Sequence, residues 1–172
     1  MAVIPQTRSN PYQRAHRQIA SRTLQADAIA FARVAYAGHS GEFGEPSIEH
    51  PLRVMAALGS EDTRIVALLH DTLAHSVATF ADVRVFLPNR LVMAVAAFAP
   101  PLEESEGIAS HFILADPIAL AVKLACIADL TDPRRLARLD PFTRRRREVA
   151  GAAAALALGT TLPNVLATWN QA

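Results

Sequence analysis

The sequence predicts an all-α helical bundle, because apolar residues recur at helical spacing and no segment alternates polar and apolar residues over a useful length. No Asn-Gly or Asp-Gly pair marks a tight hairpin turn. Capping residues, glycine and proline divide the apolar segments into about six to eight helices, which is the pattern of a bundle.

The first predicted helix opens at Asn10 and Pro11, which suit the N-cap and the first helical position, and Gly38 ends it. Glycine and proline in the following stretch, 40–47, predict a loop. The later helices are delimited in the same way, by capping residues, glycine or proline. They are expected at 50–58, 61–76, 80–87, 89–99, 117 to about 131, and 141–158.

Three local features complete this prediction. Ser60 is expected to cap the helix at 61–76, and Thr79 with Asp82 to form a capping pair before 80–87. The acidic stretch 101–110 is expected to be a loop or a frayed helix.

The composition fits one domain spanning residues 1–172 and excludes several function classes. Lys plus Arg 17 against Asp plus Glu 16 leaves a net charge of +1, so no overall field attracts nucleic acid or a membrane surface. The single cysteine cannot form an internal disulfide and fits a reducing compartment. No signal-like segment or uninterrupted apolar stretch of membrane-spanning length is present, so we expect a cytoplasmic protein. The run Arg144–Arg147 is expected to be a solvated helix face.

An adjacent histidine and aspartate, His70 and Asp71, lie within an otherwise apolar helical segment. Burying such a pair is costly unless it finds partners. One solution is a divalent metal held between helices, on which His39 and His50 are the natural candidates to converge. The other is that Asp71 holds a core histidine through a hydrogen bond, and the pair alone does not decide between them.

Three motifs occur in order: GHSGEFGEPSIEHPLRV, IVALLHDTLAHS and AVKLACIADLTDPRRL. This series resembles the HD-superfamily metal-dependent phosphohydrolases, and among them the RelA/SpoT-type guanosine polyphosphate (ppGpp) pyrophosphohydrolase domain and its small stand-alone relatives. The resemblance covers about residues 25–158. It implies an HD-domain-like bundle and a site between its helices.

The resemblance also implies roles for individual residues. His39, His70 and Asp71 match the metal ligands of the family, and Cys126 stands at the position of the fourth ligand. The positions that match residues beside the nucleotide are His50, Lys123 and Leu130.

This chain departs from the family pattern at the positions that carry catalysis. Cys126 replaces the aspartate ligand, and Ala74 and His75 replace the two acids that position and activate water. Of these two, only His75 can accept a proton, so it is the candidate catalytic base. The loop after His39 is short and lacks a basic residue, and Ser47 stands in place of an aromatic side chain. Leu130 replaces a polar residue.

The metal, if bound, depends on what Cys126 does. A carboxylate-rich site suits Mn²⁺, whereas a ligating thiolate favours Zn²⁺ or Fe²⁺. Cys126 can equally be a small buried hydrophobe, in which case Asp129, on the same helix face, is a substitute ligand. The site is therefore expected to hold Mn²⁺, to hold Zn²⁺ or Fe²⁺, or to hold no metal.

Two functions remain open. The chain is expected to be a degenerate HD-domain protein with lost or much reduced hydrolase activity and a retained pocket for a small ligand. The alternative is a divergent but active metal-dependent nucleotide phosphohydrolase. In both cases the partner is a small molecule or nucleotide, not nucleic acid or a membrane, and the oligomeric state is left open.

The retained pocket is expected to prefer an uncharged or partly apolar ligand to a polyphosphate. Neighbouring imidazoles are expected to resist protonation, because each added positive charge disfavours the next. The pocket is expected to be lined by His39, His50, His70, Asp71, His75, Cys126 and Leu130.

Overall fold

A computed structural model describes residues 23–41, 43–76, 78–99 and 106–169. Within these ranges all regular structure is helical, apart from one isolated bridge between Ser40 and Pro46. The helices are α2 (Leu24–Ala35), α3 (Glu49–Ala56), α4 (Glu61–Leu69), α5 (Thr72–His75), α6 (Phe80–Arg84), α7 (Asn89–Ala96), α8 (Glu106–Ala115), α9 (Pro117–Leu130), α10 (Pro133–Leu136), α11 (Pro141–Ala157) and α12 (Leu162–Trp169). Eight of the eleven have eight residues or more, and the predicted all-α class is confirmed.

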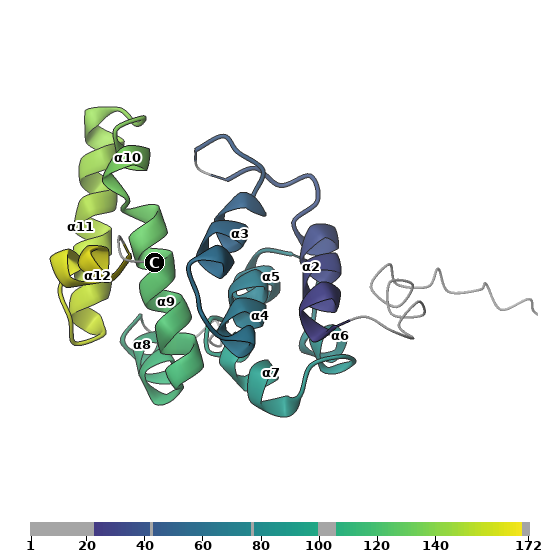
Figure 1. Cartoon of the computed structure of the whole chain (residues 1–172). Coiled ribbons are helices and arrows are strands. Elements are labelled where there is room, and N and C mark those ends of the chain that lie inside the picture. The colour runs from purple at the N-terminus through teal and green to yellow at the C-terminus, as the bar shows by residue number, and fades with distance from the viewer. Residues whose placement is uncertain (1–22, 42, 77, 100–105, 170–172) are drawn as a thin grey trace, which may run out of the picture.

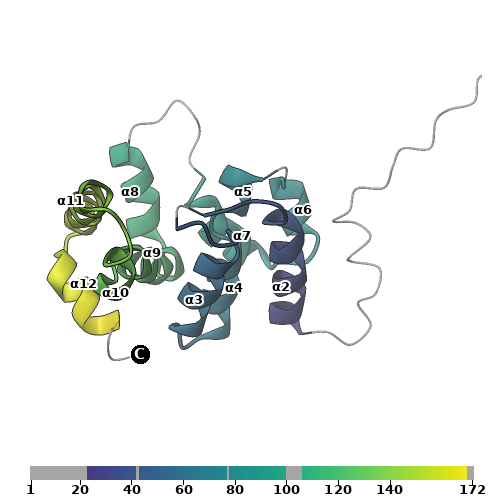
Figure 2. The ribbon, with the colours of Figure 1, turned by 90° about the horizontal axis from the view of Figure 1, so that it is seen from above.

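Helix α9 lies between two groups of helices, with α2 to α7 on one side and α11 and α12 on the other (Figures 1 and 2). Its sequence, PIALAVKLACIADL, is apolar on nearly every face, as expected for a helix covered on several sides. Val122, Ala125 and Cys126 join the core cluster of the first group, whereas Ile127 and Ala128 join that of the second. The helix that carries Cys126 and Asp129 is thus held by both cores.

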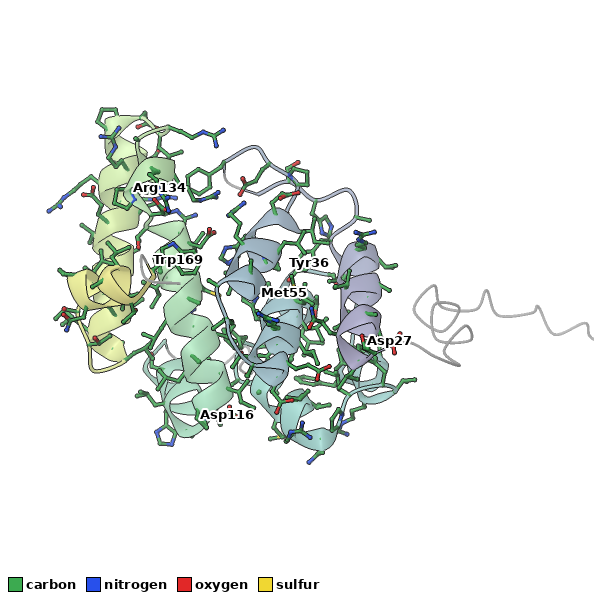
Figure 3. All side chains as sticks on the ribbon, viewed as in Figure 1. Asp27, Tyr36, Met55, Asp116, Arg134 and Trp169 are labelled. Atoms are coloured by element: carbon green, nitrogen blue, oxygen red, sulfur yellow. The ribbon has the colours of Figure 1, made fainter. Side chains whose placement is uncertain are left out.

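Side chains fill the spaces between these helices (Figure 3). Trp169 and Phe98 pack against both core clusters. The two clusters are therefore in contact through shared neighbours as well as through α9.

Side-chain caps fix several helix starts where the sequence predicts them. Ser60 accepts from the backbone N–H of Thr63, and Thr79 forms a complete capping box with Asp82. Three helices begin with an Asp-Pro pair whose carboxylate accepts backbone N–H groups. These pairs are Asp116-Pro117, Asp132-Pro133 and Asp140-Pro141.

Several helix boundaries differ from the prediction. The segment expected as one helix at 61–76 is interrupted after Leu69, because His70 Nδ1–H and Thr72 Oγ1–H donate to main-chain carbonyls of the preceding turn. The acidic stretch at 101–110 is partly helical, since α8 begins at Glu106. The helix start expected at Asn10 lies outside the described residues, but the single helix expected from there to Gly38 is wrong, because α2 begins at Leu24 after Thr23, whose extended backbone and side-chain hydrogen bond to Ala26 N–H form an N-cap.

No single helix in the described ranges is both long and apolar enough to cross a membrane. Together α11 and α12 satisfy the length and composition criteria, but the pair is bent by 95° at the break between them.

Candidate functional site

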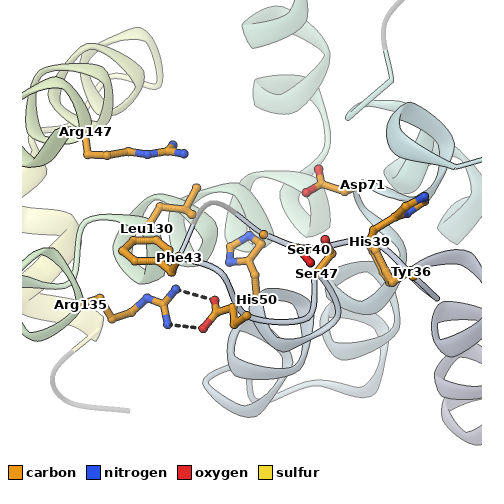
Figure 4. Close-up of a pocket in the computed structure, with 13 residues that line it drawn as sticks. Tyr36, His39, Ser40, Phe43, Ser47, His50, Asp71, Leu130, Arg135 and Arg147 are labelled. Atoms are coloured by element: carbon orange, nitrogen blue, oxygen red, sulfur yellow. Dashed lines mark hydrogen bonds and ion pairs between the residues drawn. The ribbon is translucent and has the colours of Figure 1, made fainter. Parts of the chain in front are cut away.

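A pocket of about 740 Å³ opens between the two groups of helices (Figure 4). One wall comes from the end of α2 and the following loop, where Gly38 adopts a φ of +78° that favours glycine. The opposite wall comes from α10 and α11, and His50 and Asp71 also contribute. Because its walls come from both groups of helices, the pocket depends on their packing around α9.

A buried carboxylate, Asp129, holds His50 and Arg53 at one side of this pocket. Its Oδ2 accepts from His50 Nδ1 at 2.7 Å, and its Oδ1 accepts from Arg53 Nε at 2.7 Å. The side chain of Asp129 is 1% exposed. Burial favours its neutral form, but the hydrogen bonds from His50 and Arg53 outweigh this and lower the pKa of Asp129 from 3.8 to about 2. The carboxylate is therefore ionised, and the proton on His50 Nδ1 points toward it.

A second carboxylate, Glu45, forms ion pairs with two arginines beside the pocket, Arg53 and Arg135. Its Oε1 accepts from Arg53 Nη2 at 2.8 Å and from Arg135 Nη2 at 2.7 Å. The guanidinium of Arg135 also lies over the ring of Phe43, 4.2 Å from its centroid. The charge of Arg135 is therefore already compensated within the protein.

The buried pair His70 and Cys126 lies next to His50. Cys126 Sγ is 3.4 Å from His70 Nε2, and the rings of His50 and His70 are edge to face at 5.3 Å between centroids. His70 Nδ1 donates to the carbonyl of Ala67 at 2.8 Å, and its Nε2 lies 3.2 Å from Asp71 Oδ2. His70 and Asp71 are adjacent in the sequence, and their side chains meet because helix α4 ends at Leu69.

The charges of this cluster are coupled. Burial favours the neutral thiol of Cys126, but His70 and His50 outweigh it and lower its pKa from 9.0 to about 6. Burial likewise opposes an imidazolium, yet Cys126 and Asp71 raise the pKa of His70 well above 6.5. Burial is outweighed at His50 too, where Asp129 and Cys126 raise the pKa. The expectation that neighbouring imidazoles resist protonation is therefore wrong. Repulsion between His50 and His70 is present, but attraction to the nearby groups Asp129, Cys126 and Asp71 outweighs it.

The structure brings together part of the predicted metal site. The side chains that place potential ligand atoms within 4.8 Å of one another are His50, His70 and Cys126. His39 lines the pocket, but it is not in this group, and Figure 4 shows its ring pointing away from His50 and Asp71. Asp129, the proposed substitute ligand, is instead bound to His50 and Arg53.

The predicted ligand-binding residues separate. His50 and Leu130 line the pocket, whereas Lys123 is not among its lining residues and places its ammonium 5.9 Å from the ring centroid of Phe98. The side chain of His75 lies outside what the structure describes, so its predicted catalytic role stays a prediction. His70 and Cys126 are buried behind the lining and do not form part of it.

Several pocket residues were not predicted. Tyr36, Phe43 and Glu45 come from α2 and the loop that follows it, and Arg135 and Arg147 come from the opposite wall. Arg147 thus departs from the expected solvated helix face, and burial lowers its pKa. Phe43, Glu45 and Arg135 lie within the motif segments, but the resemblance assigned them no role, and Tyr36 and Arg147 lie outside those segments. Only the side-by-side packing of distant segments reveals them.

The residues present do not match a site for a hard ion such as Mn²⁺. Such ions prefer carboxylate and water oxygens, whereas the clustered atoms here are two imidazole nitrogens and a sulfur. Two carboxylates contact this cluster from outside it: Asp71 lies 3.2 Å from His70 Nε2, and Asp129 accepts from His50 Nδ1. The donor set fits a softer ion.

Comparison with solved structures shows the fold. The chain superposes on a metazoan orthologue of SpoT, described as hydrolysing ppGpp and playing a role in starvation responses, with a TM-score of 0.65 and 17% sequence identity. The match covers 88% of this chain and 94% of the other. No protein-family profile and no curated protein sequence matches the chain. The resemblance to RelA/SpoT-type HD domains is therefore confirmed at the level of the fold.

Proposed function

We propose that this chain is a degenerate HD-type domain that binds a small ligand in its pocket and has lost, or retains little of, the ability to hydrolyse ppGpp. The structural relative is described as a ppGpp hydrolase, and its fold is shared here. Fold alone does not transmit activity when the site has changed.

The charge balance of the pocket is the observation that carries this proposal. Among the described lining residues, Glu45 and Asp71 oppose Arg135 and Arg147, so their formal charges cancel. Glu45 also holds Arg135 directly, through a hydrogen bond of 2.7 Å. A polyphosphate would have to displace this carboxylate or leave its own charge uncompensated in a partly buried space. The pocket therefore favours an uncharged or partly apolar ligand.

The catalytic positions support the same proposal. Hydrolysis of a phosphoester requires a base within hydrogen-bond reach of the attacking water. Ala74 stands at one of the two acidic positions of the family motif and cannot accept a proton. Loss of a general base costs about 100- to 10,000-fold in rate.

The first test is turnover of ppGpp by the full chain with Mn²⁺ supplied. We expect no hydrolysis above a very slow background, and turnover near about one per second, the low end of ordinary enzymes, would contradict the proposal. The second test is a thermal-shift screen across about pH 5.5 to 8 that compares neutral compounds with nucleotides and pyrophosphate. Strong stabilisation by polyphosphates alone would contradict the predicted ligand class.

A variant of Glu45 separates charge balance from pocket shape. Glu45→Gln removes one negative charge from the pocket, so we expect pyrophosphate to bind roughly tenfold more tightly. Glu148→Gln is the matched control, because it makes the same charge change at a residue of α11 that pairs with Arg145 and does not line this pocket. Equal effects of both substitutions would show that Glu45 does not exclude anions.

A further inference from the structure

We propose that His50, His70 and Cys126 form a zinc site. Asp71 lies beside His70 but outside the group of ligand atoms that are within 4.8 Å of one another, so its carboxylate turns toward the ion to become the fourth ligand. This ligand set differs from the one that the sequence motifs imply, because His50 takes the place of His39. The inference rests on the proposed function. A metal that has a structural role would explain why the site has changed and yet keeps several metal-ligating residues.

The two imidazoles are already oriented for a metal. The carbonyl of Ala67 can only accept, so His70 Nδ1 carries a hydrogen and its Nε2 faces the cluster. The ionised carboxylate of Asp129 fixes His50 in the same way, with Nδ1 donating at 2.7 Å. Histidines that ligate metals characteristically donate their other ring N–H to a carboxylate or a backbone carbonyl. One histidine here has each type of partner.

The surroundings of His70 Nε2 also indicate a cation. This atom lies 3.4 Å from Cys126 Sγ and 3.2 Å from Asp71 Oδ2. A single Nε2–H would have to be shared between the sulfur and the oxygen in a weakened bifurcated hydrogen bond, whereas one cation beside Nε2 contacts both directly. On a tetrahedral zinc, a nitrogen and a sulfur ligand lie about 3.5 Å apart and a nitrogen and an oxygen ligand about 3.3 Å apart. The two separations observed are close to these values.

The donor set selects the kind of ion. Two imidazoles, one thiolate and one carboxylate suit Zn²⁺, whereas Mn²⁺ and Mg²⁺ prefer oxygen ligands. Cys126 is 4% exposed and His70 is 3% exposed, while Asp71 lies at the pocket wall. With Asp71 bound, four protein ligands surround the ion, as in structural zinc sites, and no position is left for a hydrolytic water. The zinc would therefore hold α4, α3 and α9 together at the base of the pocket.

Cobalt substitution of the full chain, prepared without a histidine tag, tests this site. We expect one Co²⁺ per chain, with visible bands of a tetrahedral site and a near-ultraviolet thiolate-to-cobalt charge-transfer band that zinc abolishes by displacement. Cys126→Ser is expected to lose the charge-transfer band. His50→Gln is expected to weaken zinc binding by more than the about 10- to 100-fold that removal of an outer hydrogen-bond partner costs.

His39→Gln is the matched control, because His39 lines the same pocket but lies outside the cluster. It is expected to leave the cobalt spectrum and the zinc affinity unchanged. If Cys126→Ser does not fold, Cys126→Asp replaces it, with the expected result that preference shifts from Zn²⁺ toward Mn²⁺. Absence of the charge-transfer band in the unsubstituted chain overturns the inference. So does a loss of binding in His39→Gln that equals the loss in His50→Gln.

The outcomes separate this inference from the proposed function. A chain that binds no zinc and does not hydrolyse ppGpp overturns the zinc site and leaves the proposed function standing. A chain that turns over ppGpp overturns the proposed function, whichever metal its spectrum reveals.

Discussion

The contacts of Asp129 predict a large loss of stability when its charge is removed. Asp129→Asn keeps the shape of the side chain but removes the buried anion that His50 and Arg53 share, so His50 loses its carboxylate partner and Arg53 keeps only Glu45. Lowering of the Asp129 pKa from 3.8 to about 2 corresponds to about 2–3 kcal/mol at about 1.4 kcal/mol per pKa unit. Breaking a buried ion pair from one side costs about 3–5 kcal/mol. We therefore expect the free energy of unfolding to fall by about 2–5 kcal/mol.

The control is an ion pair of similar geometry at the surface. Arg90 donates to both carboxylate oxygens of Asp62, but the side chains are 61% and 33% exposed. Asp62→Asn is therefore expected to cost little stability, because solvent screens this pair. Urea unfolding followed by circular dichroism, with a chelator present so that no bound metal contributes, measures both variants. Equal losses in the two variants, or a loss below about 1 kcal/mol for Asp129→Asn, would refute the reasoning.

Two other properties follow from contacts described above. The pKa of Asp129 is lowered from 3.8 to about 2, so the stability that this carboxylate contributes is present above about pH 4 and is lost as pH falls toward about 2. The pKa of Glu45 is lowered too, so its contribution is also lost on acidification. Circular dichroism against pH should show the loss, and a flat response between about pH 4 and about pH 2 would contradict it. Gly151 packs against Thr131, whose hydroxyl is fixed by a 2.6 Å hydrogen bond, and an added methyl would collide with Thr131 Cγ2. Gly151→Ala should therefore destabilise the protein by about 1–3 kcal/mol, although alanine has the better helix propensity. Gly59→Ala is the control, because open space surrounds Gly59 and no loss is expected. Equal thermal midpoints in the two variants would count against this packing.

Most of the fold is predictable because its signals are local. A capping box at Thr79 and Asp82, and an Asp-Pro pair before each of three helices, depend only on residues a few positions apart. The break after Leu69 was not predicted, since it depends on side-chain donors taking carbonyls within an apolar, helix-forming segment. The signal was present in His70 and Thr72, but hydrophobic periodicity hides it.

The site is predictable only in part, for a different reason. Order and spacing of motifs identified His70, Cys126 and His50, but not which histidine joins the cluster. That choice depends on Asp129, which lies 79 positions from His50 in the sequence and binds its Nδ1. The pocket arginines, Arg135 and Arg147, approach from the far wall; Arg135 lies in the third motif segment without an assigned role, and Arg147 lies outside the motifs. Contacts between distant segments decide these details, and periodicity contains no information about them.

The position of α9 between two cores has a consequence for motion and for ligand response. Residues on one face of this helix belong to the core of α2 to α7, and residues on the other face to that of α11 and α12. The pocket lies across the same boundary, with His39 and Phe43 on one wall and Arg147 on the other. Any small rotation of α11 relative to α2 therefore changes the width of the pocket without breaking either core. A molecule that contacts both walls would oppose that rotation, so occupancy of the pocket is linked to the relative orientation of the two halves.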